Sequence, residues 1–213
     1  MNIVEALKNA GLLSPETQRD IEKKESERQQ IQGKKFVKLN EIQTEEDLDR
    51  FLEFEDYLEE HKLIPALRCA VRIKQSDIKQ TCLIRFIDAC FERMTNEANE
   101  PECIVPLPLF WLNGALAAAE ILQESIEKTL ILKKIIGVCR KSVEDYVPNF
   151  HPIEGTWLRT ACKATNSLPD SNTYLKKIIK SAIITGNRQE AKNFVELLPD
   201  SHSKNNFKEQ LGM

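Results

Sequence analysis

The feature that most constrains the fold is a degenerate internal repeat centred on small residues. Its four copies start 48, 47 and 30 residues apart, at Ala66, Gly114, Ala161 and Ala191. The repeat is clearest in the last two copies, where the tetrapeptide Leu-Pro-Asp-Ser ending at Ser171 recurs thirty positions later, ending at Ser201. One such unit cannot bury its apolar face alone, so the copies are expected to stack on one another.

Each copy has the pattern of a helix, a tight turn and a second helix. Small residues one turn apart, such as Ala66 and Ala70, share a face of the first helix and let a neighbouring backbone approach. The turn contains Ser or Pro-Asp-Ser, which are N-cap residue types. Apolar residues at three- and four-residue steps form the buried side of the second helix, namely Leu83, Ile84, Phe86 and Ile87, and Leu130, Leu132, Ile135 and Ile136. We therefore expect an all-α chain of stacked antiparallel helical hairpins.

This combination of small-residue positions and a capped turn resembles the α-solenoid class of short helical hairpins, of which tetratricopeptide-like repeats are the best-known relative. The tetratricopeptide signature of Trp, Leu-Gly and Tyr has no place in any copy, and the spacing departs from that family's constant period of about 34 residues. The resemblance therefore implies architecture alone: a right-handed superhelix with a concave groove for a ligand. It implies no individual binding residue.

Two proline-rich insertions account for the unequal spacing. One covers residues 101–108 and the other covers residues 148–155, shortly before Trp157. Their prolines exclude a continuous helix through either segment. We expect ordered connectors, and because both also contain apolar residues, the alternative is that they border a groove.

The chain of 213 residues is expected to form one domain with an N-terminal arm. Residues 1–40 are interpreted as an N-terminal helix and a charged linker, and residues 41–213 as the helical repeat domain. Thr44 is predicted to open the first helix of this domain, with Asp47 at the capping-box position. No apolar run approaches the roughly 20 residues that span a bilayer, and the N-terminus lacks a secretory pattern. A soluble, cytoplasmic protein is expected, and delivery elsewhere by an unrecognised signal stays open.

Charge is spread unevenly along the chain. Residues 1–60 have nine basic and sixteen acidic side chains, whereas residues 171–213 have seven basic and four acidic ones. Acidic residues are densest around the apolar stripe of residues 45–60, where a solvated helix face is the simplest interpretation. The functional hypothesis is a surface that docks a basic partner segment. It would consist of Glu53, Glu55, Asp56, Tyr57, Glu59 and Glu60.

No motif in the sequence predicts a catalytic, metal or cofactor site. The six cysteines form no CxxC pair, so they are expected to be free, buried thiols. The three histidines have no partner at metal-ligand spacing, and no phosphate-binding glycine loop or nucleophile elbow is present. Nucleic-acid binding is not expected, because the net charge is −3 and the basic face formed by Lys176, Lys177 and Lys180 is short.

Two functional hypotheses remain. The first is a non-enzymatic adaptor, chaperone or effector that binds another protein or peptide on its helical-repeat surface, with no cofactor. The second is an enzyme or small-ligand binder with a pocket at the 148–157 insertion, lined by Trp111, His151 and Trp157. An open groove across successive first helices would favour the first hypothesis, and titratable groups converging in a closed pocket would favour the second. The oligomeric state is left open.

Overall fold

The fold is all-α over the residues that the structure, a computed structural model, describes: residue 37 and residues 41–97, 107–145 and 151–213. The predicted N-terminal helix and linker, residue 37 aside, lie outside these ranges. The helices are α3 (Glu45–Glu59), α4 (Leu63–Arg72), α5 (Ser76–Glu97), α6 (Leu107–Ile121), α7 (Ile126–Asp145), α8 (His151–Thr165), α9 (Ser171–Ile184), α10 (Arg188–Glu196) and α11 (His202–Leu211).

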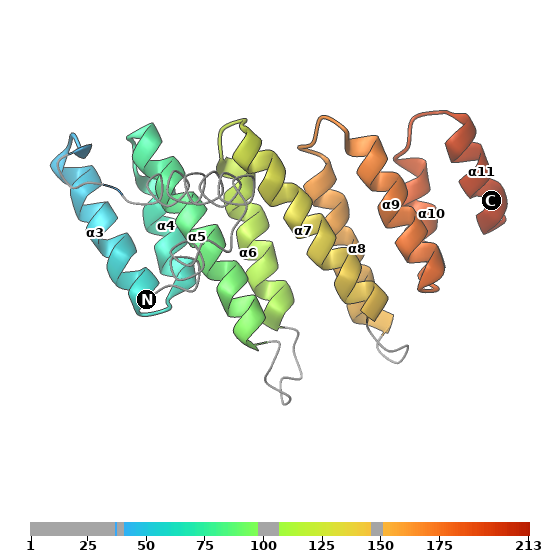
Figure 1. Cartoon of the computed structure of the whole chain (residues 1–213), viewed down its shortest axis with the longest axis horizontal. Helices are drawn as coiled ribbons and strands as arrows, with labels where there is room; N and C mark the ends of the chain where they lie inside the picture. Colours follow the sequence, from blue (N-terminus) through green and yellow to red (C-terminus); the bar gives the residue numbers. More distant parts are fainter. Residues whose placement is uncertain (1–36, 38–40, 98–106, 146–150) are drawn as a thin grey trace, which may run out of the picture.

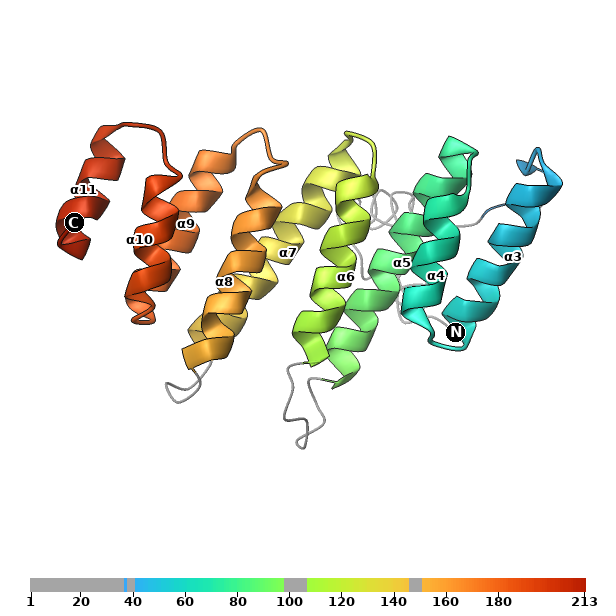
Figure 2. The ribbon, with the colours of Figure 1, turned by 180° about the vertical axis from the view of Figure 1, so that it is seen from behind.

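Consecutive helices run antiparallel and lie in two rows (Figure 1). Helices α3, α5, α7, α9 and α11 form one row, and α4, α6, α8 and α10 form the other, which is nearer the viewer in Figure 2. The largest contacts join α5 with α6 and α7 with α8. The pairs with the largest contacts are thus not the pairs joined by the predicted tight turns. The apolar core lies between the two rows.

The small residues of the predicted repeat lie in the row of even-numbered helices. Ala66, Ala161 and Ala191 are fully buried in α4, α8 and α10. In α6, however, the fully buried equivalent of Ala66 is Ala115, while the predicted Gly114 is only partly buried. Burial in α4 and α6 therefore matches at a spacing of 49 residues (115 minus 66), whereas the sequence predicted 48. One residue turns a helix by about 100°, so only one alignment directs the same positions at the core.

Two serines cap equivalent turns, and one of them, Ser201, belongs to a predicted Pro-Asp-Ser turn. The hydroxyl groups of Ser125 and Ser201 accept hydrogen bonds from the backbone N–H groups of Lys128 (3.0 Å) and Lys204 (3.3 Å), at the starts of α7 and α11. The tetrapeptide Leu-Pro-Asp-Ser, which ends at Ser201 before α11, also precedes α9 but caps that helix differently. There the N-cap residue is Asp170, and its side chain makes no capping hydrogen bond.

Lysines complete the same two turns. The ammonium group of Lys128 donates to the backbone carbonyl of Leu122 (2.9 Å) and pairs with Glu124 (2.8 Å). Lys204 likewise donates to the carbonyl of Leu198 (3.0 Å) and pairs with the carboxylate four residues before it (3.5 Å). Both lysines are buried, and these contacts provide acceptors for an ammonium group removed from water. A pattern of Leu, Ser and Lys three residues apart thus builds both turns.

The proline-rich insertions end earlier than the sequence suggests. Helix α6 begins at Leu107 and helix α8 at His151, so Pro108 and Pro152 lie in the first turns of these helices. Proline is tolerated there because the first N–H groups of a helix have no partner within the helix. The remaining residues of the insertions, up to 106 and up to 150, lie outside the described ranges.

Five of the six cysteines lie within the described ranges, and all five are free and buried. Burial raises the pKa of Cys82, Cys90 and Cys139 to about 12 and that of Cys162 to about 11. These thiols are therefore protonated at neutral pH and act as small core residues. In the part of the chain that the structure describes, no helix is long and apolar enough to cross a bilayer.

Candidate protein-binding site

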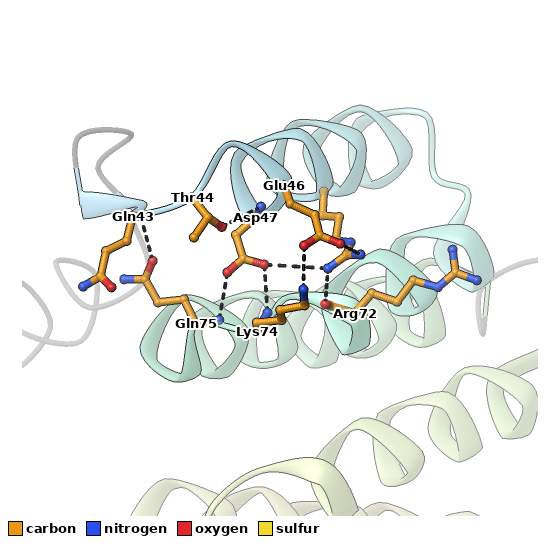
Figure 3. A network of polar contacts seen from close by, with 8 residues as sticks. Gln43, Thr44, Glu46, Asp47, Arg72, Lys74 and Gln75 are labelled. Carbon is orange, nitrogen blue, oxygen red and sulfur yellow. Dashed lines mark hydrogen bonds and ion pairs between the residues drawn. The ribbon is translucent and has the colours of Figure 1, made fainter.

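The first turn of α3 contains a structural junction built around Asp47. Asp47 is only 1% exposed, and its carboxylate accepts hydrogen bonds from the backbone N–H groups of Lys74 (2.8 Å) and Gln75 (2.9 Å), in the turn between α4 and α5 (Figure 3). The predicted N-cap is confirmed, because the hydroxyl group of Thr44 accepts from the N–H of Asp47 (3.2 Å). The predicted capping box is not formed, because the carboxylate of Asp47 accepts from Lys74 and Gln75 instead of from the backbone N–H of Thr44.

The protonation of Asp47 follows from these contacts. Burial alone would raise the pKa of this carboxyl group, but the N–H groups of Lys74 and Gln75, the hydroxyl group of Thr44 and the charge of Arg50 together hold its pKa below the ordinary value. Asp47 is therefore ionised at neutral pH. Its charge fixes the start of α3 to the next turn of the chain.

Neighbouring contacts strengthen this junction. The guanidinium group of Arg50 donates to the carbonyl of Arg72 (2.7 Å). The ammonium group of Lys74 pairs with Glu46 (2.6 Å) (Figure 3). The side chain of Gln75 accepts from the backbone N–H of residue 43 (3.0 Å). Glu46 and Asp47 at the start of α3 thus have partners within the fold.

Three of the predicted docking residues, two on α3 and one at its C-cap, also have partners within the molecule. Glu55 forms a bidentate pair with Arg85 of α5, whose Nη2 lies 2.6 Å from Glu55 Oε2. Glu60 pairs with Lys62 (2.7 Å), and Glu53 accepts a hydrogen bond from the thiol of Cys69 (3.5 Å). Glu55 therefore joins α3 to α5, and reversing its charge would disturb the fold as well as any docking surface.

The other predicted docking residues differ in their surroundings. Tyr57 is half-buried and packs against the core, whereas Asp56 and Glu59 are exposed on the outer side of α3. The structure thus divides the six predicted residues between internal contacts and an outward face. Of the predicted docking residues, Asp56 and Glu59 are the two that a partner can contact without breaking a contact within the molecule.

Of the second predicted site, lined by Trp111, His151 and Trp157, the structure describes two side chains, and these two lie in different surroundings. Trp157 is 4% exposed and belongs to the core, whereas Trp111 is partly exposed and lines a cavity that does not include Trp157. His151 is the first residue of α8, and its side chain lies outside the description. Trp111 is thus the member of this set that lines the cavity described next.

That cavity is an apolar groove between the first halves of α4 and α6, which we call the α4–α6 groove. It has a volume of about 310 Å³, and Phe86 of α5 contributes to its lining. Its other lining residues are Leu63, Ile64, Leu67 and Arg68 of α4 and Phe110, Trp111, Asn113 and Gly114 of α6. Both helices belong to the row that is in front in Figure 2.

Large apolar side chains are exposed at this groove. Ile64 is 50% exposed and Phe110 is 47% exposed. The ring of Phe110 packs edge-on against Trp111, with ring centroids 4.7 Å apart and an interplanar angle of 74°. Adjacent exposed apolar and aromatic side chains are typical of surfaces that bind other proteins.

Gly114 helps to keep the groove open. A Cβ atom added at this position would lie 3.6 Å from the sulfur of Cys90 and 3.7 Å from the ring of Phe86, which are ordinary contact distances. The fold thus has space for a methyl group here. With glycine at this position, that space is part of the groove.

The lining of the groove contains few polar groups. Its lining residues include no carboxylate, histidine or cysteine, and Arg68 is exposed. Asn113, its other polar residue, accepts a hydrogen bond from Thr160 of α8 (3.0 Å). Within the described ranges, no three His, Cys, Asp or Glu side chains come together as possible metal ligands.

The sequence pattern did not indicate the α4–α6 groove, because its lining residues are far apart along the chain, with Ile64 in α4 and Phe110 in α6. A signal was nevertheless present in residues 107–121, which are apolar on nearly every side of the helix. A helix of that kind is usually covered on more than one face.

No protein-family model matches the chain, and comparisons with curated proteins and with solved structures gave no match.

Proposed function

We propose that this protein is a non-enzymatic protein–protein interaction module whose α4–α6 groove binds apolar side chains from a segment of a partner protein. The single observation that carries this proposal is the pairing of half-exposed Ile64 and Phe110 with an apolar hollow. Leaving these side chains in water costs free energy that a partner would recover by covering them. The proposed partner segment therefore has apolar anchor residues.

The groove suits a protein segment better than a small molecule. Small-ligand sites combine an apolar cavity with a few polar groups that fix the orientation of the ligand. In this groove Asn113 already bonds with Thr160, which leaves Arg68 as the polar group on the rim. Arg68 would favour a carboxylate beside the apolar anchors of the partner, because an arginine forms bidentate pairs with carboxylates.

We further propose that the helices form a short α-solenoid-like stack of repeated hairpins. Two observations support this architecture: the equivalent turns at Ser125 and Ser201, and the buried alanines that recur in α4, α6, α8 and α10. The α4–α6 groove lies between the first helices of two successive hairpins. A solenoid of this class offers its binding surface across successive helices in the same way.

The test uses the full-length protein and a displayed library of random peptides, with counter-selection against the variant Ile64→Glu/Phe110→Glu. Selected peptides are expected to have apolar anchors and to bind wild-type protein at least about 10-fold more tightly than the variant, a difference of about 1.4 kcal/mol. Because Trp111 is partly exposed and Trp157 is buried, acrylamide quenching of fluorescence reports mainly on Trp111. Peptide binding in the groove should protect the fluorescence of Trp111 from quenching by acrylamide.

Leu197→Glu is the matched control, because Leu197 is an exposed apolar residue outside the groove. This variant is expected to bind the selected peptides as wild-type protein does. Thermal unfolding of all three proteins checks that each is folded. The proposal is wrong if the selected peptides bind the groove variant and wild-type protein equally, or if they leave the quenching of Trp111 unchanged.

A further inference from the structure

The outer side of α3 presents an acidic stripe with an apolar residue at its centre. Its residues follow one another at steps of four and three and are all exposed, namely Glu45, Asp49, Leu52, Asp56 and Glu59. They lie opposite the buried side of the helix, which contains Phe51 and Phe54. Leu52 is 45% exposed. We call this set the α3 stripe.

The row that contains α3 has a surface of opposite charge farther along. Exposed lysines lie on the outer sides of α7 and α9, at Lys134 and Lys141 and at Lys177 and Lys180. Helix α9 has three lysines and no acidic residue, whereas α3 has eight acidic residues and one arginine. Two apolar side chains lie on the same outer sides, Leu130 at 61% and Ile184 at 78% exposure. We call these six residues the α7–α9 surface.

Aromatic rings hold some of these lysines in place. The ammonium group of Lys134 lies 3.7 Å from the ring centroid of Phe91 in α5, and that of Lys177 lies 4.9 Å from the ring centroid of Tyr174. Lys133, beside this surface, lies 5.4 Å from the centroid of Tyr174 and pairs with Asp170 (3.7 Å). Such contacts limit the freedom of a lysine, so less entropy is lost when a carboxylate partner binds.

We propose that the α3 stripe of one copy docks on the α7–α9 surface of a second copy of this chain. The carboxylates of Asp49, Asp56 and Glu59 then meet the lysines, and Leu52 is covered by the exposed apolar residues of the other copy. The occupant is argued from complementarity, because an acidic stripe with a central leucine and a lysine surface with exposed apolar residues are present on one molecule. The two surfaces are different patches, so the contact is heterologous and head-to-tail, and it can add copies without closing.

This contact and the proposed partner groove lie on opposite rows of helices. The α3 stripe and the α7–α9 surface belong to the row in front in Figure 1, whereas the α4–α6 groove is lined mainly by the row in front in Figure 2. Self-association therefore does not rest on the proposed function. Each can fail without the other.

The test is sedimentation velocity on the full-length chain from about 1 to about 100 µM, at about 20 mM and about 500 mM salt. At low salt the mean mass of wild-type protein is expected to rise with concentration above the 24.5 kDa of one chain, and to exceed that of a dimer. At high salt this rise should disappear, because the Debye length falls to a few ångströms. Two charge-reversal variants probe the contact: Asp49→Lys/Asp56→Lys/Glu59→Lys, and Lys134→Glu/Lys177→Glu/Lys180→Glu.

Each reversal variant alone is expected to stay monomeric, since its two surfaces then have the same sign. An equal mixture of the two should associate again, because every α3 stripe then meets a surface of opposite charge. Lys163→Glu on the other row is the matched control and should associate as wild-type protein does. If a reversal variant unfolds, as judged by circular dichroism, Lys134→Gln/Lys177→Gln/Lys180→Gln replaces it, with at least about 10-fold weaker association expected.

Three results would overturn the proposal. The first is wild-type protein that stays monomeric at low salt over the whole concentration range. The second is association that both reversal variants retain. The third is association that each variant loses but their mixture does not regain, which would assign the two charged surfaces to other partners.

Discussion

At the residue scale, buried charged side chains explain how the chain turns between helices. Asp47 receives backbone N–H groups from a turn that lies about thirty residues away, and Lys128 and Lys204 donate to carbonyl groups of the turns that precede them. Each charge is satisfied by backbone groups that would otherwise be left without partners. These residues stabilise the fold, which separates them from the exposed charges available for binding.

Asp47→Ala is expected to lower the free energy of unfolding by about 2–3 kcal/mol, because two backbone N–H groups lose a charged acceptor. Asp49→Ala, an exposed change in the same helix, should have an effect within about 0.5 kcal/mol. Denaturant unfolding measures both variants. It is done in high salt, where the self-association proposed above is screened.

The pH dependence of this stability follows from the lowered pKa of Asp47. Because the pKa in the folded state lies below the unfolded value of about 3.9, the stabilisation by Asp47 is present above pH about 4 and is lost as the pH falls through the folded pKa. The difference in unfolding free energy between wild-type protein and Asp47→Asn should therefore be constant from pH 7 to pH 5 and should shrink on further acidification. A difference that persists undiminished at pH 2 would argue against this role.

At the element scale, the helices differ in what their outer sides face. Helix α7 packs on α6, α8 and α9, yet Gly137 in its middle faces solvent. A Cβ atom added at Gly137 would meet no atom within 4 Å, and the same is true of Gly186, which lies in the turn before α10. The two positions differ in backbone conformation, since Gly186 has a φ of +78°. An alanine substitution at either position therefore changes the backbone preference without adding a packing contact.

Gly137→Ala is expected to raise the free energy of unfolding by about 1 kcal/mol, because alanine loses less conformational entropy in a helix than glycine does. Gly186→Ala should lower it by about 1–2 kcal/mol, because a left-handed conformation is strained for a residue with a Cβ atom. Thermal or denaturant unfolding in high salt compares the two. Shifts of the same sign would show that α7, or the turn at Gly186, is not built as described.

At the scale of the whole molecule, each helix contacts mainly its near neighbours in the chain. Contacts join each helix chiefly to the next and the next but one, and α11 packs mainly on α10. In such an arrangement stability is roughly a sum of local units and the interfaces between them. Opening of part of the molecule need not disturb the remainder.

Amide hydrogen exchange is therefore expected to be fastest in α11 and slowest in α5, α6 and α7, whose neighbours cover them on both sides. Phe207→Ala, which removes a buried ring from α11, should speed exchange in α10 and α11 and leave α5 and α6 nearly unchanged. Mass spectrometry of peptic fragments measures both effects. Uniform exchange along the chain, or acceleration in every helix of the variant, would indicate a single cooperative unit instead.

The sequence by itself determined the features that depend on near neighbours in the chain. These are the all-α composition, the buried alanines such as Ala66 and Ala191, and caps such as Thr44 and Ser201. All follow from helical periodicity and from hydrogen bonds over three residues. The sequence also placed acidic residues on one helix, but it could not divide them between internal and external roles.

The tertiary structure decided which of these residues face each other. It pairs Glu55 with Arg85, turns Asp47 toward Lys74, and brings Ile64 beside Phe110 to open the α4–α6 groove. It also matches the buried residues of α4 and α6 at a spacing one residue longer than the predicted one. These outcomes depend on the register in which helices distant in sequence pack together, and a periodic apolar pattern marks the buried side of a helix without naming the helix that covers it.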